Sequence, residues 1–253
     1  MEVRDALFEY VLRLGDNALI LGQRLSELVG RAPELEEEMA LVNIALDYIG
    51  QARMLLTYAG EIEGKGRDED QLAYLRDVLD FRNVLLVEQP NGDFAHTIAR
   101  LFLISAFNEQ LYGRLVRSRD GRLAEIAEKA LKEVRYHVRH SGEWVIRLGD
   151  GTEESHRRMQ KALDDLWMYT GELFTPDEID RVMAEEGIGP DLPALKPLWD
   201  ERVDAVLREA GLERPADGWM PTGGKDGRMH SEHLGHLLAE MQFLQRAYPG
   251  LRW

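Results

Sequence analysis

Apolar residues that recur every three or four positions constrain this chain most, because that period is typical of helices with one buried face. The first such run covers about seven helical turns and contains Leu7, Val11, Leu14, Ala18, Leu21, Leu25 and Leu28. Three further long runs follow, at residues 34–59, 94–117 and 123–148. No stretch alternates convincingly in the way that a half-buried strand requires, so the sequence predicts an all-α protein.

The breaks between these runs predict the topology. Short breaks at residues 30–33 and 118–121 separate the first run from the second and the third from the fourth, so each pair should form an antiparallel hairpin. A long connection, residues 61–93, joins the hairpins and contains one short helical piece. Two helical hairpins joined by a long crossover are the topology of ferritin-like four-helix bundles.

We see no second domain boundary and expect one domain over residues 1–253. The core bundle should cover about 5–149, and a helical C-terminal extension should follow at about 153–247. Its shorter helices are predicted at residues 153–173, 176–186, 191–210 and 230–247.

Composition narrows the function classes. The net charge of −15 makes nucleic acids and anionic membranes poor partners. The absence of cysteine excludes disulfides and iron–sulfur clusters, so carboxylates and the seven histidines are left as metal ligands. No apolar run is long enough to cross a bilayer, and the charged N-terminus is unlike a signal peptide. We therefore expect a cytoplasmic protein.

A ferritin-like fold raises the question of a di-iron site, and the stretch LKEVRYHVRH at 131–140 invites it. Such a site needs a Glu from each of two helices and Glu-x-x-His from each of the other two. Asp16, Asp47 and Glu133 take the expected carboxylate positions, with Asp16 and Asp47 at equal depth about the first loop. The third residue after Asp47 is Gly50 and the third after Glu133 is Tyr136, so neither box keeps its imidazole.

His137 does not repair the second box, because it lies about 100° further round the helix than Tyr136. The partner expected for Glu133 on the third long helix falls near Phe107, flanked by Ser105 and Glu109, so the fourth carboxylate is ambiguous. We assign no catalytic, cofactor-binding or metal-binding residue. The positions of a degenerate di-iron site, whose polar side chains bond to one another, are Asp16, Asp47, Gly50, Glu133 and Tyr136. Residual metal binding by His137 stays open.

The stretch HSEHLGH contains His230, His233 and His236. Steps of three residues advance about 300° each, so three such histidines do not share one face. We favour a helix start that docks on a neighbouring element, with Ser231 as its cap. A metal site formed by His230 and His233 stays open.

The stretch TGGKDG at 222–227 is not a Walker loop, because Asp226 follows Lys225 and no strand precedes it. Its backbone amides suit a phosphate or a partner's carboxylate. An ordinary exposed loop is the interpretation that we favour.

Five long segments follow one another in an order that is typical of one family. They are RLGDNALILGQRLSE (13–27), LVNIALDYIGQARMLLTYAGE (41–61), NVLLVEQPNGDFAHTIAR (83–100), KEVRYHVRHSGEWVIRLGDGT (132–152) and TGGKDGRMHSEHLGHLLAEMQFLQR (222–246). Together they resemble the structural C subunits of bacterial phenylacetyl-CoA epoxidases, the multicomponent ring oxygenases of phenylacetate breakdown. The resemblance covers nearly the whole chain.

That resemblance implies a ferritin-like subunit that is not itself catalytic and carries no cofactor. Its partner would be the homologous catalytic A subunit, which holds the di-iron centre and binds the CoA thioester. A small B subunit and a reductase with flavin and iron–sulfur groups would complete the complex, with electrons coming from NADPH. Whether residues 222–227 or the C-terminal tail contact CoA stays open.

Two alternatives remain. One is an independent di-iron oxygenase or oxidase that uses irregular ligands such as His137. The other is a homo-oligomeric ferritin-like protein with no oxygenase partner. The interface, the stoichiometry and the formation of a homodimer by the isolated chain also stay open.

Overall fold

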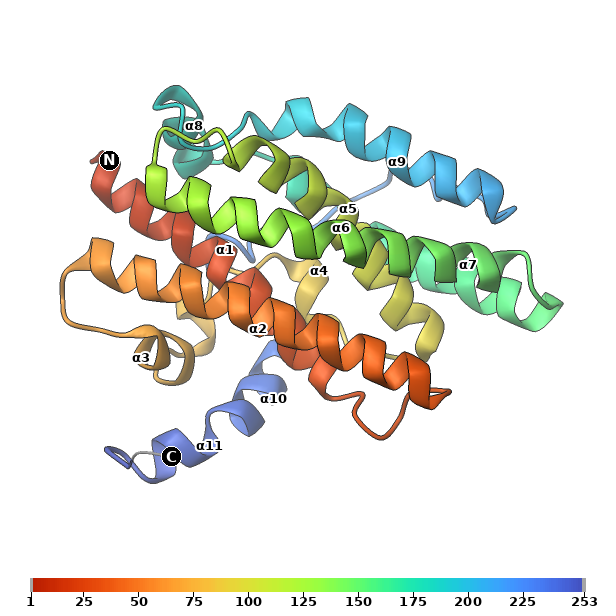
Figure 1. Cartoon of the computed structure of the whole chain (residues 1–253), viewed down its shortest axis with the longest axis horizontal. Coiled ribbons are helices and arrows are strands. Elements are labelled where there is room, and N and C mark those ends of the chain that lie inside the picture. The colour runs from red at the N-terminus through yellow and green to blue at the C-terminus, as the bar shows by residue number, and fades with distance from the viewer. Residues whose placement is uncertain (1, 252–253) are drawn as a thin grey trace.

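A computed structural model describes residues 2–251, and within that range the regular elements are helices, with no strand. The core contains α1 (Val3–Ser26), α2 (Leu35–Glu63), α5 (Phe94–Leu115) and α6 (Gly121–Gly149). Helix α1 packs along α2, α5 packs along α6, and α2 also contacts α6 (Figure 1). The expected all-α, ferritin-like arrangement of two hairpins is therefore confirmed.

The crossover between the hairpins holds more structure than the one short helix that the sequence predicts. It contains α3 (Glu69–Tyr74), η1 (Val78–Asp80) and α4 (Leu85–Glu88). Helix α2 also continues past Gly60, where a Cβ would overlap the Arg67 carbonyl group. Glycine is needed at position 60 because the chain returns so close to it. Helix α2 ends at Glu63 and is capped by Gly64, which has a φ of 71°.

Side-chain caps explain where α5 and α6 begin. The Asp93 carboxylate accepts a hydrogen bond from the His96 backbone N–H at 3.0 Å. The Asp120 carboxylate accepts one from Leu123 N–H at 2.8 Å. Each aspartate thus satisfies one of the N–H groups that a first helical turn leaves without a partner.

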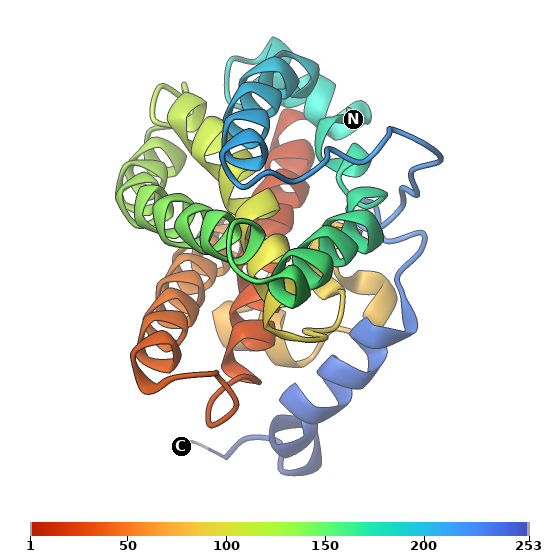
Figure 2. The ribbon, with the colours of Figure 1, turned by 90° about the vertical axis from the view of Figure 1, so that its right-hand side faces the viewer.

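The C-terminal extension wraps the bundle (Figure 2). Helix α7 packs on α5, α8 packs on α1, and α9 packs on both α5 and α6. The bounds are α7 (Glu153–Trp167), η2 (Gly171–Phe174), α8 (Glu178–Glu185), η3 (Leu192–Leu195), α9 (Lys196–Glu209), α10 (Glu232–Met241) and α11 (Phe243–Ala247). The structure thus divides three of the predicted helices into two shorter pieces each. These are the helices predicted at residues 153–173, 191–210 and 230–247.

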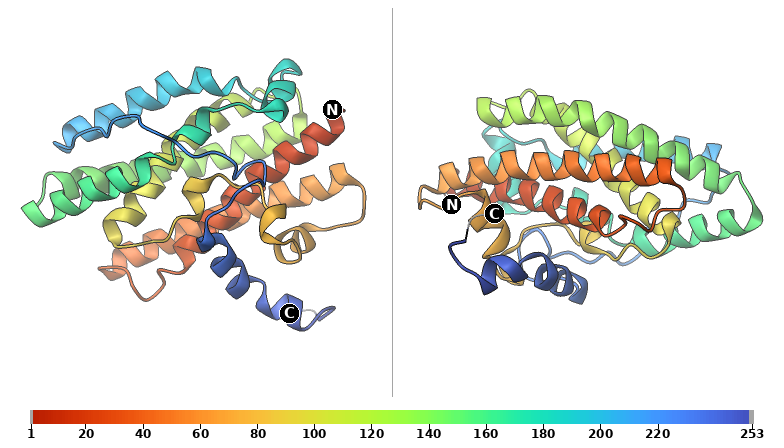
Figure 3. Two further views of the ribbon diagram at one scale, coloured as in Figure 1. Left: turned by 180° about the vertical axis from the view of Figure 1, so that it is seen from behind. Right: turned by 60° about the horizontal axis from the view of Figure 1, so that its bottom comes forward.

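The last two helices, α10 and α11, lie beside the crossover and project away from the bundle (Figure 3). Buried apolar side chains from α1 through α10 nevertheless form one continuous cluster. In the part of the chain that the structure describes, no helix is long and apolar enough to cross a membrane.

Candidate functional site

Two partly buried hydrogen bonds join α2 to α6. The His137 Nε2 atom lies 2.9 Å from Asp47 Oδ2. One turn away, Gln51 Nε2 donates to Glu133 Oε2 at 2.9 Å. Each helix supplies a pair of residues four apart, and the helices are antiparallel, so the contacts form two successive rungs. We call these four residues the α2–α6 ladder.

The ladder reverses one expectation about side-chain direction. Gln51 and His137, the fourth residues after Asp47 and Glu133, are fully buried. Tyr136 is instead 39% exposed, and a Cβ at Gly50 would meet nothing within 4 Å. Positions 50 and 136, where the two boxes would carry their imidazoles, therefore do not face the interior. The buried stripe of α6 explains it, because that stripe runs through Val134, His137, Val138 and Ser141.

Asp16 belongs to a different contact. Its fully buried carboxylate accepts hydrogen bonds from both terminal nitrogens of Arg76, one of them at 2.9 Å, and from Arg82 N–H at 2.8 Å. The neighbouring Gly15 lies against Leu55, which is about 12 Å along α2 from Asp47. The predicted equal depth of Asp16 and Asp47 is therefore wrong, because α1 and α2 do not pair symmetrically about their loop.

Helix α5 presents no carboxylate to the ladder. Ser105 Oγ lies 3.0 Å from the Tyr48 hydroxyl, and burial raises the pKa of Tyr48 to about 12 although this hydrogen bond opposes the shift. Phe107 packs edge-on against Phe174, with ring centroids 5.5 Å apart. Glu109 turns to α9, where its carboxylate lies 3.2 Å from Arg202.

The carboxylate and imidazole side chains at this site do not fit the ligand set of a di-iron centre. Such a centre in this fold uses four carboxylates and two imidazoles. The ladder offers one imidazole, His137, and two carboxylates, each already bonded to a side chain of the other helix. Asp16 is held by Arg76. Among residues 2–251, no group of three or more His, Asp or Glu side chains is arranged to hold a metal ion.

A second polar site lies at the stretch 222–227. The Glu172 Oε1 atom accepts hydrogen bonds from the backbone N–H groups of Gly223 at 2.9 Å, Gly224 at 2.8 Å and Lys225 at 3.2 Å. Its Oε2 atom accepts one from Leu85 N–H at 2.8 Å. The favoured exposed loop is therefore wrong, since all three donor residues are buried. The anion that these amides bind is the chain's own carboxylate.

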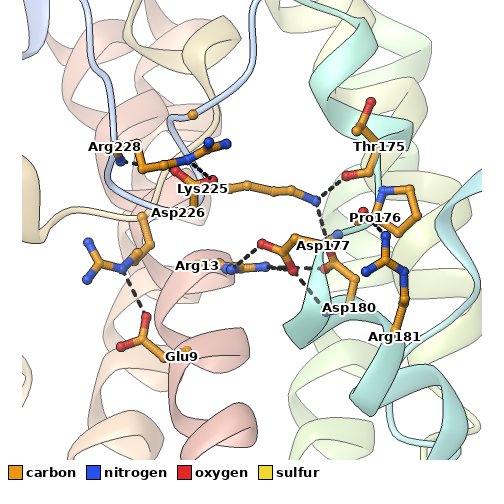
Figure 4. A network of polar contacts seen from close by, with 12 residues as sticks. Glu9, Arg13, Thr175, Pro176, Asp177, Asp180, Arg181, Lys225, Asp226 and Arg228 are labelled. Atoms are coloured by element: carbon orange, nitrogen blue, oxygen red, sulfur yellow. Dashed lines mark hydrogen bonds and ion pairs between the residues drawn. The ribbon is translucent and has the colours of Figure 1, made fainter. Parts of the chain in front are cut away.

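Lys225 extends this site into an ion cluster that joins α1 to α8 (Figure 4). Its Nζ donates to the Thr175 carbonyl oxygen at 2.6 Å and pairs with Asp180. Arg13 reaches the same place from α1 and donates to Asp177 at 2.6 and 3.0 Å. Burial alone would raise the pKa of Asp177, but the hydrogen bonds and charge of Arg13 hold it well below its usual range.

A third contact anchors the start of α10. The buried His230 ring places Nδ1 2.7 Å from Glu88 Oε2 and Nε2 3.1 Å from the Phe81 carbonyl oxygen. Ser231 N–H donates to Glu88 Oε1 at 2.5 Å. The predicted docking of this helix start is confirmed, although the Ser231 side chain makes no capping bond. His233 and His236 do not join His230: His233 is partly exposed and His236 is exposed.

The His230 contact predicts a dependence of stability on pH. Burial alone would lower the pKa of His230, but Glu88 and the Phe81 carbonyl raise it overall. The folded state therefore holds this proton more tightly than the unfolded chain, whose histidines titrate near about 6.5. The stabilisation by His230 should be complete below about pH 6.5 and should be lost as pH rises through the higher folded pKa.

Urea unfolding of the parent chain and of His230→Gln, at about pH 6 and about pH 8.5, measures this difference. The gap in unfolding free energy between the two proteins should be larger at the lower pH. His236→Gln, at an exposed site, should track the parent at both values. A gap that widens with pH would contradict the assignment.

Comparison with known proteins agrees with this architecture. The model of the family described as "Phenylacetic acid catabolic protein" matches residues 1–253. The chain is also 54% identical over 249 residues to the C subunit of the 1,2-phenylacetyl-CoA epoxidase of Escherichia coli (strain K12), an alignment that covers 98% of this chain and 100% of the relative. The resemblance expected from the five segments is confirmed, and the chain belongs to the family of phenylacetic acid catabolic proteins.

Proposed function

We propose that this chain is the non-catalytic structural subunit of a phenylacetyl-CoA 1,2-epoxidase in aerobic phenylacetate breakdown. It pairs with a homologous ferritin-like subunit that carries the di-iron centre and binds the CoA thioester. A small subunit and a flavin and iron–sulfur reductase complete the complex. The nearly full-length similarity to the C subunit of an epoxidase supports the assignment to this system.

The α2–α6 ladder carries the non-catalytic part of the proposal. Asp47 and Glu133, two of the predicted carboxylate positions, are bonded to His137 and Gln51. Each acid is thus engaged by a side chain of the neighbouring helix. Partly buried polar pairs of this kind set the register of two helices more than they add net stability. The bundle keeps the scaffold of the fold while the oxygen chemistry takes place in the partner.

The test is a comparison of iron content and mass. The chain purified alone should hold far less than one iron per molecule, measured by elemental analysis. The same chain co-expressed with the homologous catalytic subunit should elute in one complex, with about two irons per pair of chains. Near-stoichiometric iron in the isolated chain, together with dioxygen consumption, would favour an independent di-iron oxygenase instead.

The variant His137→Ala distinguishes a structural subunit from a di-iron oxygenase more sharply. If His137 ligates catalytic iron, its loss should lower the iron content and the turnover of the assembled complex together. Under the proposal, complexes of the same mass should keep their iron and their turnover within about twofold, a change below about 0.5 kcal/mol in the barrier. Ser118→Ala, on a loop outside the ladder, is the control for iron and activity that are lost during purification.

A further inference from the structure

The turn before α5 contains Asn91-Gly92, the only asparagine–glycine pair in the chain. Asparagine is chemically least stable before glycine, because the next backbone nitrogen is then unhindered and can reach the side-chain carbonyl carbon. Gly92 is exposed and has a φ of 58°. Among the residues that the structure describes, none accepts a hydrogen bond from the Gly92 N–H group. The nitrogen is therefore free to react.

The Asn91 side chain is held by three hydrogen bonds. Its Oδ1 atom accepts one from the Arg100 guanidinium. Its Nδ2 atom donates to the Arg24 carbonyl oxygen at 2.7 Å and to Glu27 Oε2 at 3.1 Å. A charged donor on a carbonyl oxygen makes the carbonyl carbon more electrophilic and stabilises the oxyanion that an attack on it produces. Arg100 is placed to do both for the Cγ atom of Asn91.

The charges around this amide are unbalanced. Arg100 is fully buried, and its two acceptors, the Gln89 carbonyl oxygen and Asn91 Oδ1, are neutral. Burial and the nearby charge of Arg24 lower the pKa of Arg100 to about 9. The Glu27 carboxylate pairs with Arg24, at 2.9 Å, rather than with Arg100. A buried cation without a counterion is unfavourable, so a carboxylate at position 91 would be stabilised.

We propose that Asn91 is a deamidation site of the folded protein and that the aspartate it becomes pairs with Arg100. The Gly92 nitrogen loses its proton to solvent and attacks Asn91 Cγ. The Cγ–Nδ2 bond breaks, ammonia leaves, and a cyclic succinimide remains. Water then adds to Cγ, the bond from Cγ to the Gly92 nitrogen breaks, and a carboxylate is left. A cavity of about 370 Å³ lined by Glu27, Asn91 and Gly92 admits that water.

Arg100 also directs the product. Water that attacks the backbone carbonyl carbon of the succinimide gives isoaspartate, in which the main chain runs through the side chain. Water that attacks Cγ gives ordinary aspartate. The backbone carbonyl oxygen of Asn91 accepts from the neutral Thr97 hydroxyl at 3.1 Å, whereas the charged Arg100 donor on the Cγ side polarises more strongly. The folded protein should therefore give mainly aspartate.

Mass spectrometry after incubation in heavy-oxygen water tests the site. The full, folded chain is kept near neutral pH for days and then digested with trypsin, which releases residues 83–100 as one peptide. Position 91 should gain one heavy oxygen atom. Asn83 is the internal control in the same peptide, since it is fully buried and precedes valine, and it should stay an amide. An intact Asn91 in the folded chain, under conditions in which the urea-unfolded chain converts, would overturn the proposal.

The ratio of the two products tests the role of Arg100. The ratio of aspartate to isoaspartate should be several-fold higher in the folded chain than in the urea-unfolded chain, where Arg100 no longer reaches position 91. Fragmentation that distinguishes the two isomers measures it. Equal ratios would overturn the part assigned to the guanidinium. Both readouts use the parent chain, so neither requires a variant of the buried Arg100 to fold, and neither depends on the proposed partner subunits.

Discussion

The substitution Asp16→Ala is expected to lower the free energy of unfolding by about 3–5 kcal/mol, the usual cost of removing one partner from a buried ion pair. The Arg76 side chain is 5% exposed and would keep its charge without a counterion. Arg82 N–H would also lose its acceptor. Urea unfolding followed by circular dichroism measures the loss.

A surface pair provides the control for this experiment. Glu125 lies 3.5 Å from Arg122, and both side chains are more than half exposed. Because solvent screens such pairs, Glu125→Ala should leave the urea midpoint nearly unchanged. The double variant Asp16→Ala/Arg76→Met should be more stable than Asp16→Ala alone, since it removes the orphaned charge as well. Equal effects of Asp16→Ala and Glu125→Ala would show that the buried Asp16–Arg76 pair stabilises the fold no more than an exposed pair does.

Glu172→Ala should cause the second large effect. Four backbone N–H groups, at Leu85, Gly223, Gly224 and Lys225, would lose their acceptor. A buried donor without a partner costs about 1–3 kcal/mol, so closing the stretch 222–227 would become unfavourable by at least about 4 kcal/mol. The chain can avoid that cost by opening locally. Fast hydrogen exchange at residues 222–227 is therefore the expected result.

The variant Glu172→Gln should give an intermediate result. Its amide oxygen still accepts from the three N–H groups of 223–225, but its NH₂ group then faces Leu85 N–H, and two donors meet. Protection at 222–227 should fall in the order Glu, Gln, Ala. Full protection in Glu172→Ala would mean that water replaces the carboxylate without cost.

The long helices were predictable because their apolar period extends over many turns and caps mark two of their starts. The direction of single side chains was not. A prediction based on i, i+3 spacing places Tyr136 inward, but the buried stripe of α6 is centred one residue further on, at His137. The pairing of residues four apart on both α2 and α6, Asp47 with Gln51 and Glu133 with His137, was visible in the sequence and was the better signal.

The role of Glu172 had no local signal at all. The carboxylate and the amides that it binds are separated by more than fifty residues, and nothing in the sequence of η2 marks one glutamate as buried. The resemblance to a known family predicts the fold but not such contacts. The same holds for Glu88, whose partner His230 lies in the last tenth of the chain.

The crossover is held from both ends of the chain, which sets an order for events during synthesis. Its first contacts, from Asp16 to Arg76 and from Asn17 to Val84, need only the N-terminal third of the protein. Those from His230 to Glu88 and from Gln242 to the Ala73 carbonyl join residues more than 140 positions apart. A ribosome must therefore release almost the entire polypeptide before the buried Glu88 meets the imidazole of His230. Until then, only the contacts with the N-terminal helix hold the crossover in place.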